Sequence, residues 1–216
     1  MPKIMNEHSF YGTKYHFYWR KSTVFDKYHK VQKAVLETTL SLIIEKELQA
    51  TSMSLIAKEA GVSTGNIYHY FDSKESIINE LYKAIVEFNG EKVLYGFYTD
   101  EPIRVRIERA WENLIRLSLQ YPQGFRFIEQ YSFSPYIHDD VKKEAYDGGW
   151  CGPLEKLYAQ AIQEKLFIEM DPSLMAQMHY GSFVYVIKGN LHGKFTLSDE
   201  EIKRLIEAAW NSVSVR

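Results

Sequence analysis

The sequence predicts an all-α protein of about nine helices, with short helices first and long ones after them. Three observations lead to this fold class. Apolar residues recur at helical spacing in nearly every long segment, no segment alternates like a strand, and glycine and proline punctuate the periodic segments. With 216 residues, of which 45% are hydrophobic and 25% charged, the chain can bury a core in one large or two small domains.

The first half of the pattern predicts four helices, at 28–48, 52–61, 63–71 and 73–97. The first carries an apolar stripe that includes Val31 and Val35. Small polar residues precede the others, and their hydroxyls can accept a hydrogen bond from the free amides of a first turn. These are Thr51 or Ser52, then Ser63, then Ser73. Gly61 can adopt the left-handed conformation that ends the second helix.

Six further segments follow, at 102–121, 122–134, 137–147, 153–167, 172–192 and 198–213, and all but the segment at 122–134 are expected to be helices. Pro102 and Pro122 open the first two, because proline suits the first turn of a helix. The stretch "YDGGWCGP" (146–153) is a break. Asp171 precedes the helix at 172–192, and Ser198 with Glu201 forms a capping box at the start of the helix at 198–213.

The stretch "AGVSTGNIYHYF" (60–71) joins two short helices through a Gly-Val-Ser turn, which is the pattern of a helix-turn-helix. Its apolar positions can close one small core: Ile56, Ala57, Ala60, Val62, Ile67 and Phe71. Donors, acceptors and aromatic rings are left facing outward, and DNA offers matching groups in its major groove and on its phosphates. The pattern therefore indicates DNA binding. The alternative is a packed helical corner whose aromatic residues are only core.

Residues 51–77 closely resemble the DNA-binding signature of tetracycline-repressor-like (TetR/AcrR) transcriptional regulators. The matching positions are Thr51-Ser52, Ile56-Ala57, Ala60-Gly61-Val62-Ser63, Gly65, Tyr68, Tyr70-Phe71 and Ser73-Lys74-Glu75. The chain departs from the family at 45–48, where a glycine is common, and at Ile77, where leucine is commoner. Neither departure touches a DNA-facing position. The resemblance continues more loosely through 125–137 and 191–213.

The resemblance implies a ligand-controlled regulator, most simply a repressor, that binds a pseudo-palindromic operator as a homodimer. It divides the chain into an extension (1–26), a DNA-binding domain (27–75) with a linking helix to about 97, and a ligand-binding and dimerisation domain (76–216). It implies DNA contacts, to phosphates, sugars or bases, by Ser52, Ser54, Thr64, Gly65, Asn66, Tyr68, His69, Tyr70 and Lys74. Within that set, Thr64, Gly65 and Asn66 would read bases.

The larger domain is expected to hold both an effector pocket and the dimer interface. Bulky aromatic residues with hydroxyl or imidazole groups suit an apolar or aromatic effector, although many of them must be core. The pocket candidates are Trp111, Phe125, Tyr131, Tyr158, His179 and Phe183. The last two helices would form the dimer interface, through Met175, Met178, Gly181, Ser182, Val186, Gly189, Leu205, Ile206 and Trp210. The alternative is that these helices only complete the core of the monomer.

Two other function classes compete with a DNA-binding regulator: a small helical enzyme and an adaptor that binds only protein. No nucleophile elbow, P-loop, Rossmann fingerprint or metal-ligand cluster occurs at supporting spacing. We therefore expect no enzyme activity, catalytic residue, metal or cofactor. A gel shift on DNA separates the regulator from both alternatives.

Charge and cysteine content set the expected surroundings. The net charge is −2, with a small positive excess in the first 75 residues that suits contact with phosphate. The single cysteine and the lack of a long apolar run predict a cytoplasmic protein with no signal peptide and no membrane span. The basic, aromatic extension could be an arm that contacts DNA, a disordered tail or the product of a misassigned start codon.

Overall fold

The computed structural model describes residues 23–215, which form ten α-helices and no strand. The all-α prediction is confirmed, with ten helices where about nine were expected. The only pairing of β type in these residues is an isolated bridge between Phe167 and Ser214. The predicted arm or tail at 1–26 falls almost wholly outside the described residues, because 1–22 are not among them.

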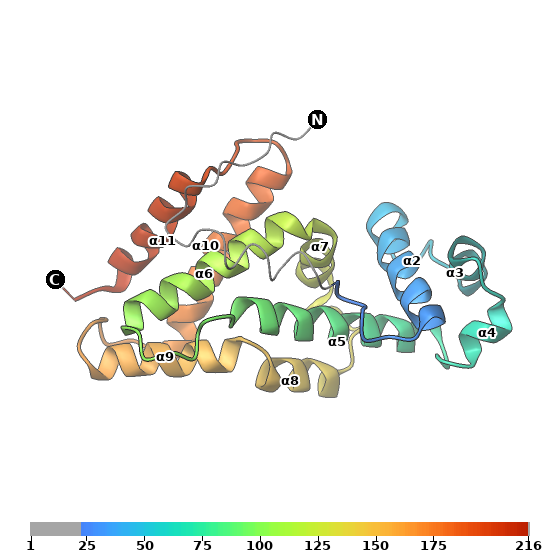
Figure 1. Ribbon diagram of the computed structural model, residues 1–216, viewed down its shortest axis with the longest axis horizontal. Coiled ribbons are helices and arrows are strands. Elements are labelled where there is room, and N and C mark those ends of the chain that lie inside the picture. Colours follow the sequence, from blue (N-terminus) through green and yellow to red (C-terminus); the bar gives the residue numbers. More distant parts are fainter. Residues whose placement is uncertain (1–22, 216) are drawn as a thin grey trace.

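Two long helices and two short ones make up the N-terminal part (Figure 1). They are α2 (Lys30–Lys46), α3 (Met53–Ala60), α4 (Thr64–Tyr68) and α5 (Lys74–Val93). Figure 1 shows α2, α3 and α4 gathered at one end of the molecule, and α5 leading away from them into the body. At 1.5 Å per residue, α5 is about 30 Å long, so one rigid helix connects the two ends.

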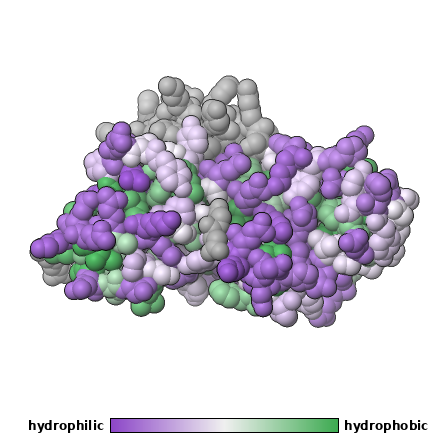
Figure 2. All heavy atoms as spheres, turned by 90° about the horizontal axis from the view of Figure 1, so that it is seen from below, coloured by the Kyte–Doolittle hydropathy of each residue, from purple (hydrophilic) through white to green (hydrophobic). Residues whose placement is uncertain are grey.

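Six helices build the body, and the last of them, drawn in red, lies at the end away from α2–α4 (Figure 1). They are α6 (Ile103–Gln120), α7 (Pro122–Tyr131), α8 (Asp139–Gly148), α9 (Cys151–Gln163), α10 (Pro172–Leu191) and α11 (Asp199–Val213). The face in Figure 2 is mostly hydrophilic, and its green patches are separated by purple side chains. The apolar side chains of the periodic stripes are therefore turned inward.

The predicted caps are confirmed. The hydroxyls of Ser52, Ser63 and Ser73 each accept a hydrogen bond from the amide three residues later. Ser198 and Glu201 form the expected capping box at the start of α11. Gly61 ends α3 with a φ of 67°, in the left-handed region where a glycine is not strained.

Several helices end earlier than the sequence predicts, and α4 and α5 are two of them. We expected 63–71 to be helical, but α4 ends at Tyr68, and the Tyr70 amide bonds to the Ile67 carbonyl in a tighter final turn. We expected the long helix to reach residue 97, but α5 ends at Val93 and the chain turns through Gly96, whose φ is 71°. A positive φ cannot continue an α-helix, which explains the second difference.

Buried side chains form two clusters. The N-terminal core joins α2–α4 and the first half of α5, and includes Leu36, Ile67 and Ile77. The C-terminal core joins α6, α9, α10 and α11 around Trp111 and Phe183. The N-terminal core is not confined to residues before 75: α7, α8 and the segment between them add four side chains, Phe127, Tyr131, Ile137 and Val141. The body therefore packs directly against the helix-turn-helix.

Candidate nucleic-acid interface

The small core expected between α3 and α4 is present and fixes the angle between the two helices. Ile56 and Ile67 are completely buried, and Ala57 and Phe71 are almost so. Ala60 and Val62 pack against the same cluster while partly exposed. Because this core holds one face of α4, the opposite face of that helix is turned outward.

The start of α4 presents an exposed, polar surface. Thr64, Gly65 and Asn66 are all exposed in its first turn. A methyl group placed on Gly65 would meet no atom of residues 23–215 within 4 Å, so nothing in this part of the chain requires glycine there. Tyr68 ends the helix with half of its surface exposed. The three first-turn residues combine a hydroxyl, an amide and a bare backbone, which are suitable groups for reading base edges in a major groove.

Two serines lie at the start of the neighbouring helix. Ser52 caps α3, and its hydroxyl also lies 3.0 Å from that of Ser54. Both side chains are exposed. Free amides and hydroxyls at a helix start can donate to a phosphate oxygen, so this end of α3 can position DNA without reading its sequence.

Tyr70 is held from two sides. Its hydroxyl lies 3.4 Å from Nδ1 of His29, and the two rings stack with centroids 6.0 Å apart. The ring of His69 meets Tyr70 edge-on at 4.9 Å. His69 is exposed, while Tyr70 is half-buried. Sequence reasoning missed His29, since it precedes Tyr70 by 41 residues and no local motif connects them.

Lys74 is half-buried at the start of α5, and its ammonium donates to the Leu48 carbonyl at 3.0 Å. An ammonium has three donors, so this bond leaves two for a phosphate. Ser73 and Ser76 cap the same helix reciprocally, each side chain accepting from the other's amide. Lys74 therefore joins α5 to the segment that follows α2, while lying at a helix N-terminus, where anions are favoured.

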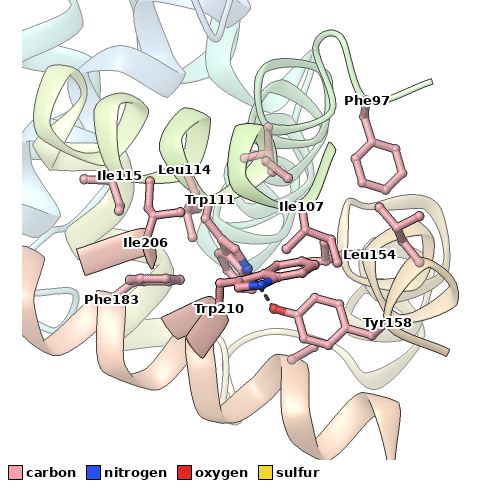
Figure 3. Close-up of a cluster of buried hydrophobic side chains, with 14 of the residues drawn as sticks. Phe97, Ile107, Trp111, Leu114, Ile115, Leu154, Tyr158, Phe183, Ile206 and Trp210 are labelled. Atoms are coloured by element: carbon pink, nitrogen blue, oxygen red, sulfur yellow. Dashed lines mark hydrogen bonds between the residues drawn. The ribbon is translucent and has the colours of Figure 1, made fainter. Parts of the chain in front are cut away.

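The aromatic residues proposed for a pocket are mostly packed as core (Figure 3). Trp111, Tyr158 and Phe183 are completely or almost completely buried, and His179 is 3% exposed. Trp111 Nε1 donates to the Tyr158 hydroxyl at 2.8 Å, and that hydroxyl lies 2.6 Å from His179 Nδ1. Tyr131 lies elsewhere, in the N-terminal core. The structure thus brings four of the six candidates together in one packed core, where hydrogen bonds link Trp111, Tyr158 and His179 in a polar chain and Phe183 packs against them.

The polar chain continues to the surface of α11. Because the Tyr158 oxygen accepts from Trp111, its proton points to His179 Nδ1, and the His179 Nε2 proton then faces the Ser212 hydroxyl at 3.2 Å. Ser212 in turn donates to the Ala209 carbonyl. Burial lowers the pKa of His179 to about 4 and raises that of Tyr158, so both groups are neutral at pH 7.

A cavity of about 50 Å³ lies beside that core, between α5, α6, α7 and α10. It is lined by Val86, Asn89, Leu114, Leu117, Ser118, Tyr121, Phe125, Ile128, Trp150 and Tyr180. Phe125 is the one predicted pocket residue in this set. Trp150, from the predicted break between α8 and α9, lies 5.5 Å from the Tyr180 ring. A wider hollow of about 160 Å³ beside Asp26 and Glu87 is lined largely by charged side chains.

The residues proposed for a dimer interface divide into two groups. Met175, Gly189, Ile206 and Trp210 are buried within the protomer, and Gly189 faces Phe195 of its own chain. Met178, Gly181 and Ser182 are exposed on α10, while Val186 and Leu205 are half-buried. Two residues that the sequence did not single out, Leu174 and Tyr185, are among the most exposed apolar side chains.

Two absences hold for the part of the chain that the structure describes. Residues 23–215 contain no helix both long and apolar enough to cross a membrane. No three His, Cys, Asp or Glu side chains within that part lie close enough to hold a metal ion.

Comparison with known families places both parts of the chain. The family model described as "Bacterial regulatory proteins, tetR family" matches residues 35–81. The one described as "Tetracyclin repressor-like, C-terminal domain" matches residues 102–214, more than half of the chain. The first match contains α3, α4 and the start of α5, and the second runs from α6 to α11.

Individual relatives of the chain are named as members of the same kind of regulator. An HTH-type transcriptional regulator of Haemophilus influenzae is 21% identical over 83% of this chain and 93% of its own length. The HTH-type transcriptional repressor KstR2 of Mycobacterium tuberculosis is 28% identical over about half of each chain. The crystal structure of a TetR family transcription regulator from Marinobacter aquaeolei has a TM-score of 0.79 at 24% identity, covering 87% of this chain and 97% of that one.

Proposed function

This chain belongs to the tetR family of bacterial regulatory proteins, and we propose that it is a ligand-responsive repressor that binds a pseudo-palindromic operator as a homodimer. The family and the named relatives are DNA-binding transcriptional regulators and not enzymes. Repression, dimerisation, the operator's symmetry and the effector are our proposals. The division into an extension, a DNA-binding domain and a larger C-terminal domain, and the cytoplasmic location, also remain predictions.

The observation that carries the DNA-binding proposal is the first turn of α4. Thr64, Gly65 and Asn66 are exposed while the opposite face of the helix is buried at Ile67. A packed corner without a partner would gain nothing from a bare glycine in open space, since glycine costs about 1 kcal/mol in a helix relative to alanine. A DNA backbone or base edge that approaches this turn closely accounts for the glycine.

Dimerisation is supported by one face of α10. Leu174, Met178, Gly181 and Tyr185 follow each other at helical spacing, and all four are exposed. A row of apolar side chains exposed along one helix favours a helix-on-helix contact with a second copy, and a twofold axis would place the same face on both sides. Two helix-turn-helix units related in this way would match the two halves of a pseudo-palindrome.

The cavity supports a neutral effector with an apolar or aromatic body. None of the described residues that line it is charged, and its polar groups include the Asn89 amide and the Ser118 hydroxyl. A cavity of about 50 Å³ holds only water-sized molecules, whereas ligand sites are typically ~300–1,000 Å³. An effector would therefore have to displace part of the wall. Trp150 is the part best placed to move, because it lies in the short connection between α8 and α9.

Selection from random double-stranded DNA tests the proposal directly. We expect the wild-type protein to recover an inverted repeat. Asn66→Ala should relax the preference at one position of each half-site, at a cost of about 1–3 kcal/mol for a lost base contact. Lys74→Ala should leave the recovered sequence unchanged and reduce the salt dependence of binding by about one unit of slope.

The two variants control for each other, since one removes a proposed base contact and the other a proposed phosphate contact. If the wild-type protein enriches no sequence, the repressor proposal fails. If Asn66→Ala returns the same motif as wild type, α4 does not read bases at that position. For the effector, neutral aromatic compounds should raise the melting temperature and weaken operator binding. A ligand that binds free and operator-bound protein equally well could not be the effector.

A further inference from the structure

Asn79 joins the start of α5 to the segment that connects α7 with α8. The residue is only 6% exposed, yet its side-chain amide makes three hydrogen bonds, two that it donates and one that it accepts. Nδ2 donates to the Glu75 carbonyl at 2.9 Å and to the Tyr136 carbonyl at 3.1 Å. Oδ1 accepts from the His138 amide at 2.9 Å. A buried amide with three backbone partners is directional and costly to disturb.

Two more observations show that the segment at 136–138 is held firmly against the start of α5. Ile137, between the two bonded peptide groups, is 1% exposed and belongs to the N-terminal core. His138 Nε2 lies 2.9 Å from a Glu75 carboxylate oxygen on the surface above it. Figure 1 shows the connection from α7 to α8 passing α5 near its end next to α2–α4. We call Asn79 with its partners in 136–138 the amide clamp.

The clamp lies where it can affect the orientation of the helix-turn-helix relative to the body. The chain passes from the helix-turn-helix into the body through α5, so a helix-turn-helix held only there could rotate about that helix. Apolar contacts between α2 and α7 oppose separation, but hydrophobic contact has no preferred direction. Hydrogen bonds do have one. The clamp therefore supplies a second, directional attachment of α5 to the body, beside the DNA-reading surface.

We propose that Asn79 is a positioning residue that sets the angle of the helix-turn-helix and thereby the operator spacing that the dimer accepts. This inference rests on the proposed binding of a pseudo-palindrome by a dimer. Changing the spacer by one base pair rotates one half-site by about 34–36° relative to the other, because a helical turn holds ~10–10.5 base pairs. A rigid pair of reading units rejects such a change, and a loosened pair tolerates it.

The experiment compares the wild-type operator with versions whose spacer is one base pair longer or shorter. The readout is the ratio of affinities, native spacer over altered spacer, for each protein. Asn79→Asp removes both donated bonds. His138→Pro removes the accepted one, at a residue whose φ of −64° suits proline. Either variant should lower the ratio about 3- to 10-fold, the equilibrium effect expected for one or two hydrogen bonds.

Matched controls separate orientation from stability. Asn113 makes the same kind of contact, donating to the Val93 and Tyr95 carbonyls, but away from the helix-turn-helix. Asn113→Asp should therefore cost stability and leave the spacing ratio unchanged. His138→Ala keeps the amide and should also leave it unchanged. A lower fraction of folded protein weakens binding to every operator alike and does not alter the ratio.

The outcomes are distinct. An unchanged ratio in folded Asn79→Asp and His138→Pro overturns the inference and leaves the proposed function standing. So does a wild-type protein that binds its operator with no spacing preference. A wild-type protein that selects no operator at all overturns the proposed function, and the inference falls with it.

Discussion

Gly65 lies in the first turn of α4 with open space around its Cα. Gly65→Ala should stabilise the free protein by up to ~1 kcal/mol, because alanine has the higher helix propensity and meets no clash. The same change should weaken operator binding, since the methyl group would occupy space that DNA needs. Gly152 is the matched control: it lies in the first turn of α9, also with nothing within 4 Å. Gly152→Ala should affect stability similarly and leave DNA binding alone. Equal operator affinity in both variants would show that DNA does not approach Gly65.

The burial of the His179 ring predicts that the stability of the folded protein depends on pH. Its pKa in the folded protein, about 4, lies below the ordinary value for a histidine because the ring is buried. The unfolded chain therefore binds the proton more readily, and stability falls as pH falls from about 6.5 toward 4. Among the described residues, its hydrogen-bond and ring partners are Tyr158, Ser212, Trp111, Phe183 and the Ala209 backbone, and none of these is a carboxylate.

Urea unfolding at pH 7.5 and pH 5 measures this effect. Between pH 7.5 and pH 5, we expect the free energy of unfolding to fall by at most ~2 kcal/mol more in the wild-type protein than in His179→Gln. The subtraction removes the titration of all other groups. Equal losses in both proteins would mean that His179 is protonated as easily in the folded state as in the unfolded state.

At the scale of helices, the chain's own sequence predicted most of the fold because the signals are local. A serine before a periodic segment acts within three residues, as Ser63 does on the Asn66 amide. The amide clamp shows where such reasoning stops. Asn79 reaches Tyr136 across 57 residues and bonds to its backbone, which carries no side-chain signature. His29 beside Tyr70 is a second case of the same kind.

The close approach of Gly189 in α10 to Phe195 in the following turn predicts that one added methyl group lowers the stability of the protein. A Cβ on Gly189 would lie 2.6 Å from Cζ of Phe195, which packs across the helix. Gly189→Ala should destabilise the protein by at most about 1–3 kcal/mol, the usual cost of overpacking, because the Phe195 ring is 46% exposed and can turn aside in part. Phe195→Ala in the same chain should remove most of that penalty, whereas additive effects in a double-mutant cycle would contradict the packing. The contact with Phe195 also explains why position 189 holds a small residue, so no contact with a partner subunit is needed to account for Gly189.

At the scale of the whole molecule, composition could not separate a pocket from a core. Trp111, Tyr158 and Phe183 have the size and polarity that suit either, and only their packing shows that they fill space. The cavity instead lies beside Phe125, Trp150 and Tyr180. The same limit applies to the last two helices: their apolar content was clear from the sequence, but which side faces the protomer's own core depends on how α6 and α9 pack.

The exposed face of α10 gives the last prediction, on assembly. Tyr185 is 74% exposed, and Met178 on the same face is 47% exposed. Tyr185→Glu should raise the dimer dissociation constant by about 10-fold or more, because a carboxylate at the centre of an apolar contact would lose its water. Tyr98, 71% exposed beyond the end of α5, is the control, and Tyr98→Glu should leave the dimer intact.

Sedimentation velocity over a range of protein concentrations measures the dimer, and operator binding is followed in parallel. A Tyr185→Glu protein that stays folded but becomes monomeric should also lose affinity for the full operator, since each half-site is then bound separately. Its affinity for an isolated half-site should stay close to that of wild type, because α4 is unchanged. A Tyr185→Glu protein that remains dimeric at the same concentrations would mean that α10 does not pair through this face, and that the two reading units are joined elsewhere.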